Sequence, residues 1–167
     1  MRKIYCGGSF KFDYIYENYK IKAEKDYRSV LLGCEELLLK HSEGIRINGN
    51  VEYIGPFYFE TDGMQDGDIV RTEWKMVQSC TDAVFLFDEA SCPGTVCELT
   101  AASMLGKRVH VFYIRKSEGE ETESTLHTPC WYPIIHSIAV NKHTCIYEYK
   151  SIDDAVAGIC DMVKKWE

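Results

Sequence analysis

The chain has 167 residues, of which 46% are hydrophobic and 27% charged, and it carries a formal net charge of −7 at pH 7. This length suits one domain with a sizeable core, so we expect a single domain over residues 1–167. The acidic charge argues against a nucleic-acid partner, because binding to a phosphate backbone needs clustered Lys and Arg.

Nothing in the sequence predicts a membrane segment. No apolar run approaches the roughly 20 residues that a helix needs to span a bilayer. The N-terminus, MRKIYCGGSF, turns glycine-rich after a short apolar stretch and lacks the apolar core of a signal peptide. We therefore expect a cytoplasmic protein without a membrane partner.

The eight cysteines are spread along the chain, and several of them, including Cys34, Cys145 and Cys160, fall on apolar stripes or strands. This distribution indicates reduced core thiols instead of disulfides. The chain has no C-x-x-C pair, and its five histidines do not combine with cysteines at zinc-site spacing. We expect no metal site and no cofactor.

The first predicted strand, Lys3–Cys6, breaks at Gly7-Gly8-Ser9, a turn in which the backbone can approach a ligand closely. A first helix is predicted from about Glu24 to His41. Its apolar positions follow helical spacing: Val30, Leu31, Cys34, Leu37 and Leu38.

A second strand is predicted over Val51–Ile54 and ends at Gly55-Pro56. The segment Ile69–Ser79 then has the spacing of a helix. We expect Val70, Trp74 and Val77 to form its buried face, and Trp74 and Tyr5 to be core aromatics.

The stretch from Asp82 to Gly106 contains a strand, a tight loop and a helix. Ala83–Phe87 is an apolar run without a polar break, typical of a strand buried on both faces of a parallel sheet. Thr95 and Glu98 fit a T-x-x-E capping box at the start of a helix that ends at Gly106. Together these features predict half of a βαβ unit.

Two further strands are predicted, over Val109–Ile114 and Cys145–Tyr149, and residues 115–128 are polar enough for a surface loop. Residues 130–138 are apolar but interrupted by Pro133, and the pattern does not assign them. Ser151 with Asp154 caps a last helix. Its buried stripe is Ile152, Ala155, Val156, Ile159 and Val163.

Strands that alternate with helices predict an α/β fold of the flavodoxin or Rossmann-like type: a three-layer sandwich around a five-stranded, mostly parallel sheet in the order 2-1-3-4-5. In that order the topological switch point, where the chain begins to add strands on the other side of the first strand, lies between the first and third strands. The Gly7-Gly8-Ser9 loop and the loop over 88–95 then flank one crevice, where such folds bind ligands.

Glu98 has two interpretations. As the third residue of a capping box, its side chain bonds the backbone at the helix start and has no chemical role. Alternatively, the helix N-terminus keeps the carboxylate ionised, and it attacks an electrophilic carbon. For Asp82, at the start of the third strand, a cap or surface acid is the simplest interpretation.

Other chemistries fit less well. Cys92 precedes a helix N-terminus, but a C-x5-R phosphate loop needs Arg where Glu98 stands. Gly7-Gly8-Ser9 is not a G-x-G-x-x-G fingerprint, and no Walker lysine follows it.

The motif IYCGGSF, followed by CTDAVFLFDEASCPGTVCELTAASMLGKRVHVFY, resembles the nucleoside 2-deoxyribosyltransferase family. The resemblance implies that Glu98 is the nucleophile that takes the anomeric carbon of the sugar, that Tyr5 orients it by a hydrogen bond, and that Asp88 contacts the sugar or the base. The chain departs from the family at Cys92 and at Trp74, where members often have acids. Asp88, Glu89 or Glu73 can take their place sterically.

The resemblance implies cleavage of an N-glycosidic bond, or base exchange, on a nucleoside or nucleotide. The alternative is a non-catalytic module that senses a nucleotide in the same crevice. The expected substrate-binding residues are Gly7, Gly8, Ser9, Phe10, Asp82, Asp88, Gly94 and Thr95. Asp88 and Glu89 favour an uncharged nucleoside over a 5′-monophosphate.

Large aromatic residues occur in two predicted loops, at Phe57-Tyr58-Phe59 and Cys130-Trp131-Tyr132. Exposed apolar side chains often mark an interface or a ligand wall. We therefore expect a homo-oligomer, while a lid or core role for the same residues is nearly as compatible with the pattern.

Overall fold

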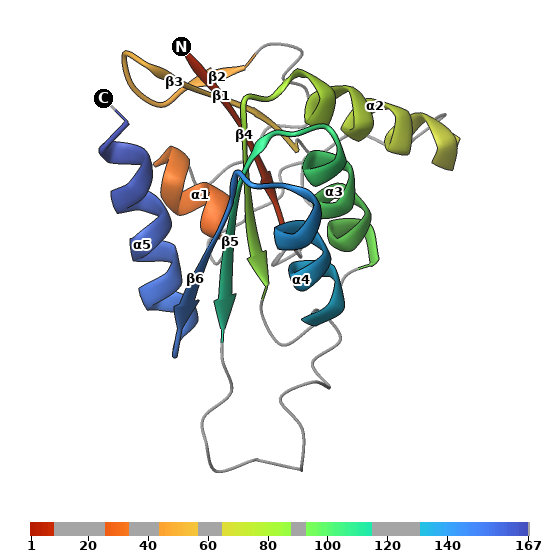
Figure 1. The fold of residues 1–167 in the computed structure, drawn as a ribbon. Helices are drawn as coiled ribbons and strands as arrows, with labels where there is room; N and C mark the ends of the chain where they lie inside the picture. The colour runs from red at the N-terminus through yellow and green to blue at the C-terminus, as the bar shows by residue number, and fades with distance from the viewer. Residues whose placement is uncertain (9–25, 34–43, 57–64, 88–92, 115–130, 167) are drawn as a thin grey trace, which may run out of the picture.

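The computed structural model of the chain shows a three-layer α/β arrangement in which helices cover both faces of one central sheet (Figure 1). The structure describes residues 1–8, 26–33, 44–56, 65–87, 93–114 and 131–166. Every statement below concerns these residues.

The sheet has six strands in the order β2-β3-β1-β4-β5-β6. Their bounds are Arg2–Gly7 (β1), Ile45–Arg46 (β2), Val51–Gly55 (β3), Asp82–Phe87 (β4), Arg108–Ile114 (β5) and Thr144–Tyr149 (β6). Strand β2 pairs with β3 in the antiparallel sense, and every other pair is parallel. The predicted order of the five parallel strands is confirmed, and the two-residue edge strand β2 is an addition that the turn-rich sequence around it concealed.

Five helices are described: Tyr27–Leu32 (α1), Asp66–Ser79 (α2), Pro93–Met104 (α3), Trp131–Val140 (α4) and Ile152–Lys164 (α5). Helices α1 and α5 cover one face of the sheet, and α2, α3 and α4 cover the other (Figure 1). Each face therefore has its own apolar core.

Strand β4 is buried along its whole length, as the unbroken apolar run predicts. Ala83, Phe85 and Phe87 belong to the core under α2, α3 and α4, whereas Val84 and Leu86 belong to the core under α1 and α5. This alternation follows from the two-residue period of a strand.

Helix α1 differs from the prediction. It ends at Leu32, because Gly33 adopts the left-handed conformation with φ 62°. Val30, expected on the buried stripe, is exposed, while Tyr27 and the polar side chains of Arg28 and Ser29 are buried. The expected stripe positions 34, 37 and 38 lie outside the described residues.

The buried face of α2 also differs from the prediction. Val77 is buried, but Val70 and Trp74 are 64% and 45% exposed, so Trp74 is not a core aromatic. Glu73 and Met76 are turned partly inward in their place. The apolar pattern failed here because an acidic residue occupies an inward position.

Helix α4 accounts for the segment that the sequence pattern left unassigned. Pro133 is its third residue. The first turn of a helix has backbone N–H groups without intrahelical partners, so a proline is tolerated there. The rest of the segment then forms a regular helix.

The cysteine predictions are confirmed in part. The five described cysteines are free; Cys6 and Cys80 are buried, but Cys145 is exposed and Cys160 only partly covered. Cys145 lies on the edge strand β6, which the sheet shields less than its central strands. Within the described part of the chain, no helix is long and apolar enough to cross a membrane.

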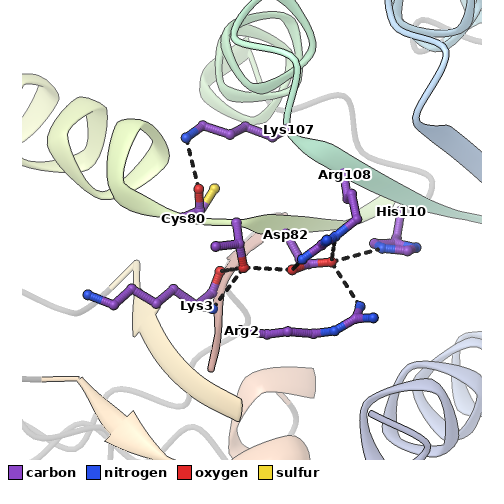
Figure 2. A network of polar contacts seen from close by, with 8 residues as sticks. Arg2, Lys3, Cys80, Asp82, Lys107, Arg108 and His110 are labelled. Carbon is purple, nitrogen blue, oxygen red and sulfur yellow. Dashed lines mark hydrogen bonds and ion pairs between the residues drawn. The ribbon is translucent and has the colours of Figure 1, made fainter. Parts of the chain in front are cut away.

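Asp82 is the centre of a network of ion pairs at the amino end of the sheet (Figure 2). Its carboxylate accepts hydrogen bonds from Arg2 of β1 at 3.1 Å and from Arg108 of β5 at 2.7 Å, and His110 Nε2 lies 3.6 Å away. Burial raises the pKa of Asp82, but contacts with the side chains of Arg108, His110 and Thr81 outweigh it and hold the pKa well below its usual range.

Replacing Asp82 with Asn is expected to lower the free energy of unfolding at pH 7 by roughly 3 kcal/mol, because one partner of a buried charge network is removed. The depressed pKa means that this stabilisation is present above about pH 4, the value for unfolded Asp, and is lost as pH falls further. Urea unfolding at several pH values measures it, with Asp161→Asn on the exposed face of α5 as the control. A constant difference between pH 7 and pH 3 would contradict the ion-pair account.

Candidate active site

Strands β1 and β4, between which the sequence predicts the crevice, are neighbours at the point where the strand order reverses. Gly7 is the last residue of β1, and α3 begins at Pro93 after β4. Parallel strands end at the same edge, so the turn after β1 and the first turns of α3 meet there. The chain is thus built to bring Gly7 and Glu98 together.

Glu98 does not form the predicted capping box. Helix α3 begins at Pro93, two residues before Thr95, and Pro suits the first helical position because it has no N–H to leave unpaired. Thr95 is therefore a buried residue inside the first turn, and Glu98 is in the second turn. This placement rules out the interpretation of Glu98 as the third residue of a capping box that begins at Thr95.

The Glu98 carboxylate lies directly against the backbone of β1. A Cβ atom added to Gly7 would come within 2.8 Å of Glu98 Oε2 and within 2.5 Å of the ring of Phe85. No side chain fits there. Gly7 is thus required first by the Phe85 ring and then by the Glu98 carboxylate, and its missing side chain lets the carboxylate approach the backbone as the glycine-rich turn was expected to let a ligand do.

The hydroxyl group of Tyr5 is buried beside this carboxylate. Tyr5 is fully buried, and its hydroxyl has no hydrogen bond of normal geometry among the described residues. It is nevertheless close enough to Glu98 to lower the pKa of that carboxyl. Burial, and next the charge of Glu98, raise the pKa of Tyr5 well above 10, so the phenol remains a proton donor.

Glu73, on the inward face of α2, is a second acid at the site. Its charge is close enough to raise the pKa of both Tyr5 and Glu98. Burial raises the pKa of Glu73 itself. Of the three residues considered as substitutes for the acids that the chain lacks, Glu73 is close enough to act on Glu98, and Asp88 and Glu89 lie outside the described residues.

The pKa of Glu98 is raised to about 7. Burial is the largest cause and the charge of Glu73 adds to it, whereas Tyr5 and Arg28 act in the opposite direction. This upward shift is opposite in direction to the effect expected of a helix N-terminus, and the group is mostly ionised only above about pH 7. Removal from water outweighs the helix dipole, which acts mainly within the first turn.

Tyr27 and Arg28 are site residues that the sequence analysis missed. Both side chains are buried and donate hydrogen bonds to carbonyl groups at the end of β1. The only sequence signal is Asp26, whose carboxylate caps the start of α1. Nothing in the spacing indicated that an arginine would turn toward the sheet.

The structure does not bring all expected site residues together. Asp82 lies at the amino end of β4, the opposite end of the strand from the crevice, and it is neither a cap nor a surface acid. Gly8 follows Gly7 with φ 144°, and Gly94 is exposed in the first turn of α3. Ser9, Phe10 and Asp88 lie outside the described residues.

Two comparisons with known proteins found no match: no protein-family model matches the chain, and no curated protein matches it in sequence. Among solved structures, the chain is similar to the Clostridium botulinum CMP N-glycosidase BcmB. The TM-score is 0.54 at 13% sequence identity, over 97% of this chain and 99% of that chain. This similarity shows that the two proteins share a fold.

The described residues contain no group of three or more His, Cys, Asp or Glu placed to hold a metal ion. The groups that do converge are a carboxylate, a phenol and a second carboxylate on three different elements. Such a set can attack an electrophile and transfer protons.

Replacing Glu98 with Gln is expected to stabilise the fold at neutral pH. The folded pKa lies above the ordinary value of 4.5, so the stability is fully present below about pH 4.5 and is lost as pH rises to about 7. At 1.36 kcal/mol per pKa unit, the gain at pH 8 has an upper bound of roughly 3 kcal/mol.

Urea unfolding at pH 4.5 and pH 8 measures this gain. The exposed Glu148→Gln on β6 serves as the control. Equal stability of the wild type and Glu98→Gln at pH 8 would show that the carboxylate is not held away from water.

Proposed function

We propose that the protein cleaves the N-glycosidic bond of a nucleoside or nucleotide through a covalent intermediate on Glu98. The observation that carries this proposal is the carboxylate packed against the Gly7 backbone, with a buried phenol beside it, at the switch point of the sheet. The shared fold with a CMP N-glycosidase supports it, as does the resemblance of the two motifs to the nucleoside 2-deoxyribosyltransferase family.

The reaction assigned to Glu98 is a displacement at C1′ of the sugar. A carboxylate oxygen forms a bond to C1′ while the C1′–N bond breaks, and the bonding electrons leave with the base, which takes up a proton. Water or a second base then attacks C1′, loses a proton, and releases the carboxylate. The transition state has oxocarbenium character, so a negative charge beneath the ring stabilises it.

Tyr5 and Glu73 have distinct roles in this proposal. Tyr5 remains protonated, so it can donate to the attacking carboxylate and hold its orientation. Burial raises the pKa of Glu73, which favours its protonated form near neutral pH more than exposure to water would. Glu73 is thereby suited to contact a sugar hydroxyl or to protonate the departing base.

The substrate form is the less constrained part of the proposal. Arg28 is bonded to two backbone carbonyls, and Arg71 is exposed and paired with Asp68, so neither presents a free guanidinium to a phosphate. This arrangement, with the acids at the site, favours an uncharged nucleoside. The similarity to a CMP N-glycosidase favours a 5′-monophosphate, and CMP belongs in every test panel.

Free base should be released from at least one member of a panel of ribo- and deoxynucleosides and their 5′-monophosphates. Because the attacking carboxylate must be ionised, kcat/KM should rise with pH through about 7. Glu98→Gln should lower kcat by about 10³-fold or more, as the loss of a catalytic nucleophile does in other enzymes. Chromatography of the base measures both, with Glu148→Gln as the control.

The same assay separates the alternatives. A new nucleoside formed from added free base identifies a transferase, and its absence identifies a hydrolase. Full activity in Glu98→Gln would refute the nucleophile assignment. If nucleotides raise the melting temperature without any turnover, the protein is a sensing module, because binding to the native state alone stabilises it.

We also propose that the protein is a homo-oligomer. Tyr132 on α4 is 69% exposed, and Ile135 and Ile138 on the same helix are exposed as well. The predicted aromatic segment 57–59 lies outside the described residues, so α4 carries this proposal. Multi-angle light scattering at micromolar concentration should give more than one chain mass, and Ile135→Lys should reduce it. A single chain mass for the wild type would defeat the proposal.

A further inference from the structure

We propose that Tyr27 and Arg28 at the start of α1 form a clamp on the backbone of the turn after β1, and that this clamp positions Glu98. The catalytic consequence of the clamp rests on the proposed function. The physical coupling between the clamp and Glu98 does not rest on it, and this coupling can be measured even if the protein has no enzymatic activity.

The clamp binds the carbonyl groups of three consecutive residues. Arg28 Nε donates to the Cys6 oxygen at 2.8 Å and Nη2 to the Gly8 oxygen at 2.6 Å. Tyr27 Oη donates to the Gly7 oxygen between them at 2.8 Å. The last two carbonyl groups of β1 and the first one after it thus each accept a hydrogen bond from a side chain of α1.

The arginine is held rigidly in this position. Its side chain is fully buried, and Nη1 donates to Asp26 Oδ2 at 2.8 Å. The other oxygen of Asp26 accepts from the backbone N–H of Arg28 at 2.8 Å. Because a buried guanidinium is stable only when its charge is paired and its donors are satisfied, these bonds leave it little freedom to move.

The clamp reaches Glu98 through Gly7. Oε2 of Glu98 lies within 2.8 Å of the position that a Gly7 Cβ would occupy, so a shift of the Gly7 backbone changes the space available to the carboxylate. Gly8 is equally constrained, because a Cβ there would lie 2.9 Å from the Leu86 oxygen. Gly7 is already paired with Phe85 of β4 on one side, and the hydrogen bonds of the clamp add a restraint from α1 on the carbonyl groups of both glycines.

The guanidinium also acts on the site by its charge. Arg28 lowers the pKa of Glu98, Glu73 and Tyr5, in each case against the larger effect of burial. It is a cation that all three groups share. The clamp therefore combines two effects, a geometric one from its hydrogen bonds and an electrostatic one from its charge.

Substitutions separate these two effects. Tyr27→Phe removes the bond to the Gly7 carbonyl and no charge. Arg28→Lys keeps the charge but has a single nitrogen that cannot reach both carbonyls and Asp26 in the same way. Arg28→Met removes the charge as well, and the double variant Asp26→Asn with Arg28→Met removes both ionic partners, so that no unpaired buried charge prevents folding.

The first readout is the titration of Glu98, measured by NMR of protein with ¹³C-labelled glutamate carboxyl groups. The Glu98 signal is assigned by its absence in Glu98→Gln. The titration midpoint should rise in Arg28→Met and in the double variant and stay near the wild-type value in Tyr27→Phe. Arg46→Met, an exposed cation on β2, is the control for a change of charge alone. An unchanged midpoint in the double variant would overturn the electrostatic half of the inference.

The second readout is kinetic. Tyr27→Phe and Arg28→Lys should lower kcat by about 10- to 100-fold with little change in KM, because misplacement of a reacting group by about 1 Å has an effect of this size. Wild-type kcat in both variants would overturn the positioning role. If the wild type has no activity, the proposed function fails, while the titration still decides whether the clamp acts on Glu98.

Discussion

The Glu98 carboxylate lies against the Gly7 backbone and is largely shielded from water, and the properties of the candidate site depend on the free energy of holding a charge there. Its pKa is raised to about 7; burial is the largest cause, and the charge of Glu73 adds to it. Tyr5 and Arg28 act the other way, one through its nearby hydroxyl group and one as a buried cation. The carboxylate is thus balanced between its protonated and ionised forms near neutral pH, which suits a group that must bond to carbon and later leave it.

The two ends of the parallel sheet each hold a carboxylate, and ionisation of these two carboxylates has opposite effects on stability. At the amino end, Asp82 joins β4 to Arg2 and Arg108 on the neighbouring strands, and its depressed pKa shows that ionisation favours the fold. At the carboxyl end, the ionisation of Glu98 opposes the fold. Asp82 is fully buried and Glu98 is half-buried, and the opposite sign comes from their partners. Such a cost is common where a site needs a poorly solvated reactive group.

The elements that the sequence predicted well are those whose environment repeats along the chain. Strand β4 is apolar without interruption because both of its faces are buried, and the stripe of α5 keeps its period because one face packs on the sheet. Helices α1 and α2 were predicted less well, since their inward faces carry Arg28 and Glu73, which an apolar pattern counts as outward. Both residues lie next to the candidate site, and it is at such sites that sequences most often depart from the apolar pattern of a buried face.

The sequence alone determined the α/β class, the order of the parallel strands, and Glu98 and Tyr5 as candidates, because periodicity, glycine turns and short motifs are local properties. Only the tertiary structure decided that the Glu98 carboxylate lies against the end of β1, because that depends on α3 beginning at Pro93 and on Gly7 leaving room for the carboxylate. It also separated Asp82 from the site, and it brought Arg28 to the end of β1 from a helix 20 residues away along the chain. Contacts of this kind join residues that are distant in sequence, and no spacing within one segment encodes them.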